Sequence, residues 1–100
     1  MEKKKSHYNL SLIKKLIRLK QYRITITASD NAEQYFGLRG NDVIEEILNL
    51  ETNNFYKSMT SHNNHKIWQD VYHKPIESKI AYIKLQIIDE KTVVIQFKEK

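Results

Sequence analysis

The stretch KIAYIKLQIIDEKTVVIQFK, residues 79–98, decides the fold class. In its first run, Lys79–Ile88, every second residue is apolar, and these residues share one face: Ala81, Ile83, Leu85 and Ile87. The polar residues 89–91 follow, and in residues 92–98 another alternating set shares a face: Val93, Ile95 and Phe97. A two-residue period predicts strands, so this stretch predicts an antiparallel β-hairpin with one apolar face.

Two further strands are predicted upstream of the hairpin. In residues 55–59, Phe55, Lys57 and Met59 alternate with Tyr56 and Ser58. A polar connector, residues 60–65, leads to a second run, residues 66–72, and the proline at position 75 is expected to break the chain before the long strand. Four successive strands with short connections predict an antiparallel meander.

The first half of the chain has the helical period instead. A first helix is expected after Asn9 or Ser11, with an apolar stripe made of Leu10, Ile13, Leu16 and Ile17. A short strand is expected over residues 23–27.

Two more helices complete the first half. We expect a short helix capped by Ser29 or Asp30 and ending at Gly37, then a helix opening at Asn41 or Asp42. Helices before an antiparallel meander predict an α+β fold, in which the N-terminal helices pack on one face of a mainly antiparallel β-sheet. A chain of 100 residues suits one domain, 1–100.

Composition excludes several classes of protein. The chain has no cysteine, which rules out disulfides, thiol chemistry and zinc sites of the thiolate type. No apolar stretch has the length of a membrane span, and the basic residues 1–5 lead into no signal-peptide core, so we expect a cytoplasmic protein without a membrane partner.

The net charge of +5 is unevenly distributed along the chain. Residues 1–25 carry eight Lys/Arg and one acid (+7), residues 26–54 one Arg and six acids (−5), and residues 55–100 eight Lys and five acids (+3). An ordinary domain with basic ends has such a pattern. So does a protein with a basic face that attracts a polyanion while the acidic segment lies elsewhere.

Polar side chains occupy the other face of the predicted strands. On the long strand they are Tyr82, Lys84 and Gln86, and the matching face of the next strand carries Thr92, Val94, Gln96 and Lys98. Lys57 and Gln69 also stand between apolar neighbours on their strands. Such groups are costly to bury without partners. Each lysine can instead extend to water and Gln69 can bond to backbone, so this pattern alone leaves a structural role open.

If these side chains converge, they suit the cleavage of RNA. That reaction requires the ribose 2′-OH to lose its proton, the charge on the phosphate to be stabilised and the leaving 5′-oxygen to gain a proton. Lysines stabilise phosphate charge, and a tyrosine or a lysine of lowered pKa can transfer protons. No metal or other cofactor is needed, because the 2′-OH is an internal nucleophile.

The histidines offer a competing interpretation. His62 and His65 flank two asparagines, and His73 follows Tyr72. A metal site at His62 and His65 is a weak hypothesis because no cysteine or nearby carboxylate completes the ligand set. An imidazole acid–base pair is a better one, and exposed loop histidines are the simplest reading.

Several segments together resemble a known family. FYKSMT (55–60), His65 followed by IWQDVY (67–72), YIK (82–84) and the terminal FKEK (97–100) are similar to the motility quorum-sensing regulator (MqsR) toxins. The likeness extends to the length of the chain and to its opening MEK, and it is densest over residues 55–72 and 82–100.

The resemblance implies a RelE-like fold and a toxin of a type II toxin–antitoxin system. Such toxins are metal-independent mRNA endoribonucleases that act without the ribosome, at GCU-type triplets. The resemblance further implies a cognate antitoxin with a zinc-containing N-terminal part and a helix-turn-helix DNA-binding part. The family's catalytic set falls on four residues here: Lys57, Gln69, Tyr82 and Lys98. We assign Lys57 and Lys98 to phosphate charge, Tyr82 to proton transfer and Gln69 to orientation.

The residues around this set are candidates for RNA binding: Tyr56, Met59, His65, His73, Lys74 and Lys84. One departure from the family falls among them, because His73 and Lys74 stand where related toxins have Arg-Pro. Contacts to flanking nucleotides, and with them the triplet preference, are expected to differ. A non-catalytic RNA-binding or protein-binding module is the alternative function.

Overall fold

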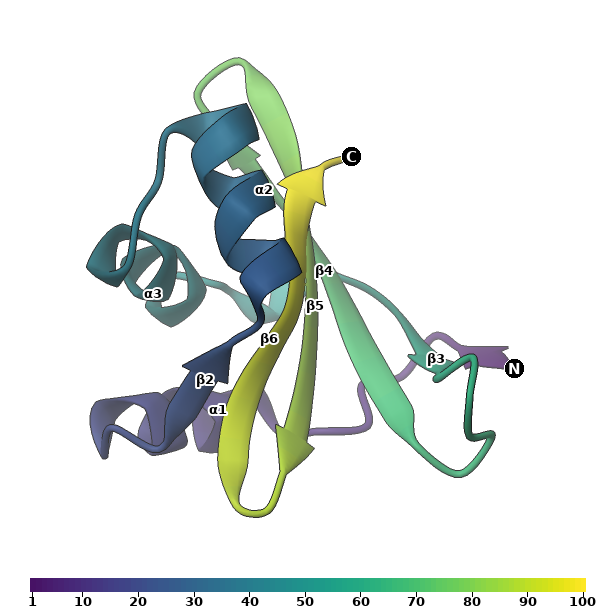
Figure 1. Cartoon of the computed structure of the whole chain (residues 1–100). Coiled ribbons are helices and arrows are strands. Elements are labelled where there is room, and N and C mark those ends of the chain that lie inside the picture. Colours follow the sequence, from purple (N-terminus) through teal and green to yellow (C-terminus); the bar gives the residue numbers. More distant parts are fainter.

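The computed structural model describes residues 1–100 and is an α+β fold (Figure 1). A six-stranded sheet has the order β1-β3-β4-β5-β6-β2, in which β2 is parallel to β6 and the other neighbours are antiparallel. The predicted fold class is therefore confirmed. The elements are β1 Glu2–Lys3, α1 Leu10–Arg18, β2 Tyr22–Ile24, α2 Ile26–Phe36, α3 Asn41–Leu48, a 3-10 turn Thr52–Asn54, β3 Phe55–Thr60, β4 Trp68–Ile76, β5 Lys79–Ile88 and β6 Lys91–Glu99.

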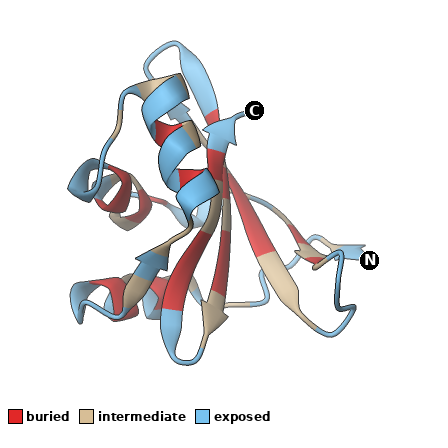
Figure 2. Ribbon diagram, in the orientation of Figure 1, coloured by how far each residue is buried: buried red, intermediate tan, exposed pale blue.

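The hydrophobic core lies between the helices and one face of the sheet. The helices contribute Ile13 and Ile17 from α1, two alanines from α2, and Val43, Ile44 and Ile47 from α3. The sheet contributes Tyr72, Ala81, Ile83, Leu85, Val94 and Phe97. Buried residues line the central strands and the inner sides of the helices (Figure 2). None of the helices is long and apolar enough to cross a bilayer.

The helix boundaries are partly as predicted. Asn9 caps α1, accepting a hydrogen bond from the Ser11 amide at 2.8 Å. The start predicted for α2 is wrong: the helix begins at Ile26 because Thr25 caps it, its Oγ1 accepting from the Ala28 amide at 3.1 Å. This earlier cap shortens the strand predicted over 23–27. Gly37 ends α2 in the left-handed conformation, with φ 70°, as predicted.

The strand predicted to stop before Pro75 runs through it. β4 extends from Trp68 to Ile76, and Pro75 is paired with Ile80 of β5. The pairing of β4 with β3 ends at Tyr72, so β4 is an edge strand beyond that point. A proline is tolerated on a sheet edge because its missing N–H removes no ladder bond there.

A register shift between β5 and β6 reverses part of the predicted facing. Lys84 is paired with Gln96, but Leu85 is paired with Val94, so Ile95 is an extra residue on β6. The extra residue turns Val94 into the core and pairs Val93 with Gln86 on the opposite face. The expectation that Val93 and Ile95 share the core face is therefore wrong, because a β-bulge breaks the two-residue period.

A second irregularity lies at the start of β3. Phe55 is paired with Tyr72 and Lys57 with Val71, which leaves Tyr56 as the extra residue. Phe55 packs against the core on the helix side, contrary to the alternation predicted for β3. Tyr56 and Lys57 both reach the other face, and Tyr56 stacks there on His73 with ring centroids 4.1 Å apart.

The N-terminal segment is anchored to the sheet by one buried carboxylate. Asp70, fully buried on β4, accepts hydrogen bonds from the backbone amides of His7 at 3.0 Å and Tyr8 at 2.9 Å. The Tyr8 hydroxyl donates to the Trp68 carbonyl at 2.8 Å. Beyond these anchors, β1 lies along the edge of β3 and pairs Glu2 with Met59 (Figure 1).

Replacing this carboxylate should destabilise the fold. Asp70→Ala leaves two partly buried amides without an acceptor, which should lower the free energy of unfolding by about 2–3 kcal/mol. Urea unfolding measures the change, with Asp30→Ala on the exposed face of α2 as the matched control, expected within about 0.5 kcal/mol of the parent chain. Equal stability of the two variants would contradict the anchoring role.

The hairpin turn between β5 and β6 allows a gain in stability. Asp89 and Glu90 both have positive φ, 51° and 61°, in a two-residue connection. Left-handed strain of about 1–2 kcal/mol at a residue with a Cβ exceeds the entropic cost of glycine, about 0.4–1 kcal/mol. Glu90→Gly should therefore raise the free energy of unfolding by about 0.5 kcal/mol. Glu90→Ala, which keeps the Cβ, is the control and should show no gain.

Candidate active site

The face of β3–β6 turned away from the helices carries the side chains predicted for catalysis. We call it the open face and define it by Lys57, Met59, Gln69, His73, Tyr82, Lys84, Gln86 and Lys98. Strand pairing arranges these side chains in rows that run across the sheet. One row contains Lys57, Val71 and Lys84, and the neighbouring row contains His73, Tyr82 and Lys98. The four residues predicted from the family resemblance thus come from four adjacent strands onto one surface.

Tyr82 is surrounded by cations on the open face. The Nζ of Lys98 lies 5.2 Å from the centroid of its ring and the Nζ of Lys84 lies 5.8 Å from it. Its hydroxyl lies 3.9 Å from the sulfur of Met59. Burial raises the pKa of the Tyr82 phenol, and the charge of Lys57 opposes the rise. The phenol is therefore protonated at neutral pH and able to donate a proton.

Lys57 forms an ion pair with a residue that was not predicted as part of the site. Its Nζ lies 2.6 Å from a carboxylate oxygen of Glu2 on β1, and the side chains are 18% and 55% exposed, respectively. This hydrogen bond raises the pKa of Lys57 and lowers that of Glu2. Pattern analysis could not find Glu2 because its position depends on how β1 pairs with β3; the family-like opening MEK was the only signal.

Gln69 is held by another amide. Its Nε2 donates to Oε1 of Gln86 at 3.0 Å, across the pairing of β4 with β5. The backbone bond considered as a structural role for Gln69 is therefore not what the structure contains. Because Gln86 is buried, this contact fixes the orientation of the Gln69 amide at the edge of the lysine cluster.

Lys84 occupies the middle of the open face, between Tyr82 and Gln86 on the same strand. Its side chain is half-buried and forms no hydrogen bond or ion pair within the chain. Burial lowers the pKa of Lys84, and the charges of Lys98 and Lys57 lower it further. Lys84 therefore differs from Lys57, whose ion pair with the Glu2 carboxylate stabilises the charged form.

His73 lies under the aromatic side chain of Tyr56. The two rings stack at 4.1 Å, and the centroid of the His73 ring lies 5.8 Å from that of Tyr82. Burial lowers the pKa of His73, as do the charges of Lys100 and Lys57, which keeps the imidazole neutral at pH 7. Its Nε2 is enclosed and has no hydrogen-bond partner in the chain.

Two candidates for RNA binding lie away from this cluster. Lys74 is on the helix side, where its Nζ forms an ion pair with Glu46 of α3 at 2.5 Å. The one-residue alternation of β4 puts it on the opposite face from His73. His65 is exposed in the connector between β3 and β4, beside a hollow of about 180 Å³ that Met59, Glu2 and His62 also line.

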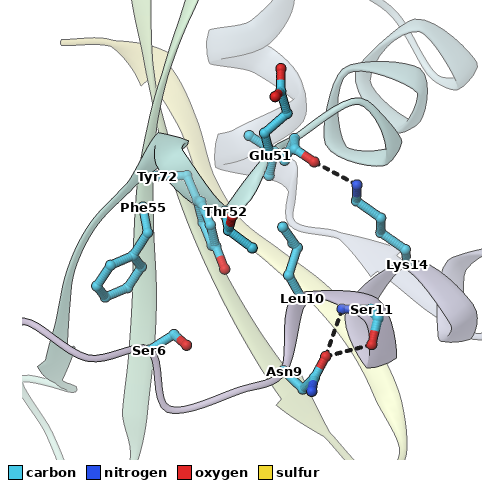
Figure 3. Close-up of a pocket in the computed structure, with 10 residues that line it drawn as sticks. Ser6, Asn9, Leu10, Ser11, Lys14, Glu51, Thr52, Phe55 and Tyr72 are labelled. Carbon is cyan, nitrogen blue, oxygen red and sulfur yellow. Dashed lines mark hydrogen bonds between the residues drawn. The ribbon is translucent and has the colours of Figure 1, made fainter.

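The largest hollow of the molecule is on the helix side, not at the open face. It has a volume of about 530 Å³ between the start of α1 and the 3-10 turn (Figure 3). Tyr72 and Phe55 form one wall and Asn9 and Leu10 the other. Burial raises the pKa of Tyr72 to about 12, which suits a core phenol. No residue predicted for catalysis lines this hollow.

The chemistry of the open face suits a phosphodiester. Lys57, Lys84 and Lys98 provide positive charge around one phenol, and the acidic residues of α2 and α3 lie on the other side of the sheet. Positive groups in a partly desolvated surface attract and orient an anion more strongly than fully hydrated positive groups do. No group of three or more His, Asp or Glu side chains forms a cluster suited to a metal ion.

Comparison with known proteins agrees with these features. The mRNA interferase toxin MqsR of Escherichia coli (strain K12) is 39% identical over 100 residues, which span the whole of both chains. The model of the family described as "Motility quorum-sensing regulator, toxin of MqsA" matches residues 5–99. With nearly the whole chain matched and a full-length relative at this identity, the chain belongs to the motility quorum-sensing regulator (MqsR) toxin family.

Proposed function

We propose that this protein is an endoribonuclease toxin that cleaves mRNA and thereby halts translation. The observation that carries the proposal is the meeting of Lys57, Tyr82 and Lys98 on one helix-free face, in a member of the MqsR toxin family. The name of the Escherichia coli relative, an mRNA interferase toxin, supports the same reaction.

The proposed chemistry assigns one task to each group. The ammonium groups of Lys57 and Lys98 bind the scissile phosphate and stabilise the charge that grows on its oxygens. The Tyr82 phenol gives its proton to the leaving 5′-oxygen, and Gln69 orients the phosphate or a base edge. The 2′-oxygen attacks phosphorus, so the products are a 2′,3′-cyclic phosphate and a 5′-hydroxyl, and the reaction needs neither water nor a metal ion.

The proposal extends to the partners of the toxin. The substrate is single-stranded mRNA, cut without the ribosome at a GCU-type triplet, and the inhibitor is a cognate antitoxin with a zinc-containing N-terminal part and a helix-turn-helix part. The family resemblance supports both statements. Tyr56, which is 42% exposed above His73, offers a flat surface on which an unpaired base can stack.

Substitutions at the site should abolish cleavage. Lys57→Ala removes a phosphate contact and Tyr82→Phe removes the proton donor, so each should lower the rate of cleavage of a GCU-containing RNA about 100-fold or more. Single-turnover cleavage in EDTA measures the rates. Lys91→Ala, exposed beside the distant hairpin turn, is the control and should cleave like the parent chain.

Undiminished cleavage by both variants would contradict the proposed mechanism. Complete loss of wild-type activity in EDTA would contradict it as well. Intact RNA after long incubation with the wild-type protein, accompanied by salt-sensitive binding, would instead identify a non-catalytic binding module.

The ion pair between Glu2 and Lys57 should weaken RNA binding in the wild-type protein. Glu2→Gln removes a negative charge that competes with phosphate for Lys57, so the affinity for an uncleavable RNA should rise, and more at low salt than at high salt. Fluorescence anisotropy with a 2′-deoxy substitution at the cut site measures the dissociation constant. Glu45→Gln, exposed on α3, is the matched control; an equal rise in both variants would attribute the effect to net charge alone.

A further inference from the structure

RNA cleavage at the open face needs a group that removes the 2′-OH proton, and the phosphate-binding roles given above leave this task unfilled. We propose that Lys84 is the general base of the reaction, an inference that rests on the proposed function. Its amine takes the proton of the ribose 2′-OH while Lys57 and Lys98 hold the phosphate.

The position of Lys84 carries the inference. Its row of the sheet lies between the row that contains Tyr82 and the row that contains Gln69, so its side chain rises in the middle of the predicted catalytic set. Its Nζ lies 5.8 Å from the ring centroid of Tyr82. Because β4 and β5 lie between the strands of Lys57 and Lys98, we place the substrate phosphate over these two strands and its ribose beside Lys84.

The surroundings of Lys84 make its ammonium group easier to deprotonate than that of an ordinary lysine. The charged and titratable groups that face it are Lys98 from β6, Tyr82 from its own strand, His73 from β4, and Lys57 from β3 with Glu2 from β1 behind it. No carboxylate contacts Lys84, whereas two ammonium groups repel its charge. The lowered pKa of Lys84 follows from this arrangement, because desolvation and like charges both destabilise the ammonium form.

The other titratable groups of the open face are less suited to the task. Glu2 holds Lys57 as an ammonium ion, and Lys98 is exposed at the rim of the face. The nitrogen Nε2 of His73 is enclosed beneath Tyr56 and out of reach of a ribose. Tyr82 retains its proton and is therefore the acid of the pair. Glu2 is a weak base, because Lys57 lowers its pKa.

The proposed proton transfers balance over one turnover. The neutral amine of Lys84 takes the 2′-OH proton, the 2′-oxygen forms a bond to phosphorus, and the bond from phosphorus to the 5′-oxygen breaks. The Tyr82 phenol donates its proton to that 5′-oxygen. The Lys84 ammonium then returns a proton to the Tyr82 phenolate, which restores both groups for the next substrate.

Lys84→Arg separates this role from simple charge. Arginine keeps the positive charge but does not lose its proton, so catalysis should fall about 100- to 10,000-fold. The dissociation constant of Lys84→Arg for the 2′-deoxy RNA should change little. Lys84→Met removes the charge as well, and a role of Lys84 in phosphate binding would require this variant to bind the RNA more weakly. Lys91→Arg is the control and should cleave like the parent chain.

The pH profile identifies the titrating group. The single-turnover rate of the wild-type protein should rise with pH as Lys84 loses its proton, at a pH below the ordinary lysine value, and should fall when Tyr82 ionises. Lys84→Arg should lose the rising limb. Lys57→Arg should be slower but keep that limb. A rising limb that persists in Lys84→Arg and disappears in Lys57→Arg would overturn the inference.

Chemical rescue excludes a folding defect. Because the chain has no cysteine, Lys84→Cys introduces a single thiol that bromoethylamine converts to an aminoethyl side chain. This side chain restores the amine with a lower intrinsic pKa, so activity should return with its rising limb shifted to lower pH. Rescue without that shift would overturn the assignment.

Failure of the inference is distinguishable from failure of the proposed function. If wild-type protein cuts RNA and Lys84→Arg cuts equally well, only the inference is overturned. If wild-type protein leaves RNA intact, the proposed function fails and the inference fails with it.

Discussion

The register of β5 between β4 and β6 is the constraint on which the open face depends. Antiparallel pairing places Tyr82 directly between His73 and Lys98, and the same pairing brings Lys84 opposite Val71, the neighbour of Lys57. A slip of one residue on β5 would turn Tyr82 and Lys84 into the core and expose Ile83. Burial of Ile83 and Leu85 against the helices therefore fixes the site as firmly as it fixes the fold.

The charges of the chain are divided between the two sides of this sheet. The acidic residues 26–54 fold into α2, α3 and their connections, and Glu46 neutralises Lys74 on that side. Lys57, Lys84 and Lys98 lie on the open face, where Glu2 is the carboxylate that contacts Lys57. The separation explains how a chain of moderate net charge can present a strongly basic surface to a polyanion.

The three lysines of the open face have different surroundings. Lys57 is paired with a carboxylate and remains charged, Lys98 is exposed, and Lys84 is half-buried without a partner. The carboxylate of Glu2 raises the pKa of Lys57, whereas burial lowers the pKa of Lys84. Such a separation is common where acids and bases must act at the same pH. The contrast cannot be read from the sequence, because Glu2 stands 55 positions from Lys57 and acts through the pairing of β1 with β3.

The sequence by itself determined the α+β class, the three helices, the long hairpin and the parity that puts Tyr82 and Lys84 on one face. Hydrophobic periodicity carries that information because each strand buries one side. Combined with the family resemblance, it also selected Lys57, Gln69 and Lys98, although no feature of the local sequence pattern distinguished them from ordinary surface groups.

The tertiary structure decided where the period breaks and which groups meet. The bulges at Tyr56 and Ile95 change which face of the sheet the neighbouring side chains occupy. The cap at Thr25 starts α2 earlier than the sequence predicts. Placement of Glu2 beside Lys57 depends on the anchoring of the N-terminal segment by Asp70. Long-range packing and hydrogen bonding determine the bulges, caps of this kind and the edge pairing. A local two-residue or 3.6-residue period contains no information about these long-range contacts.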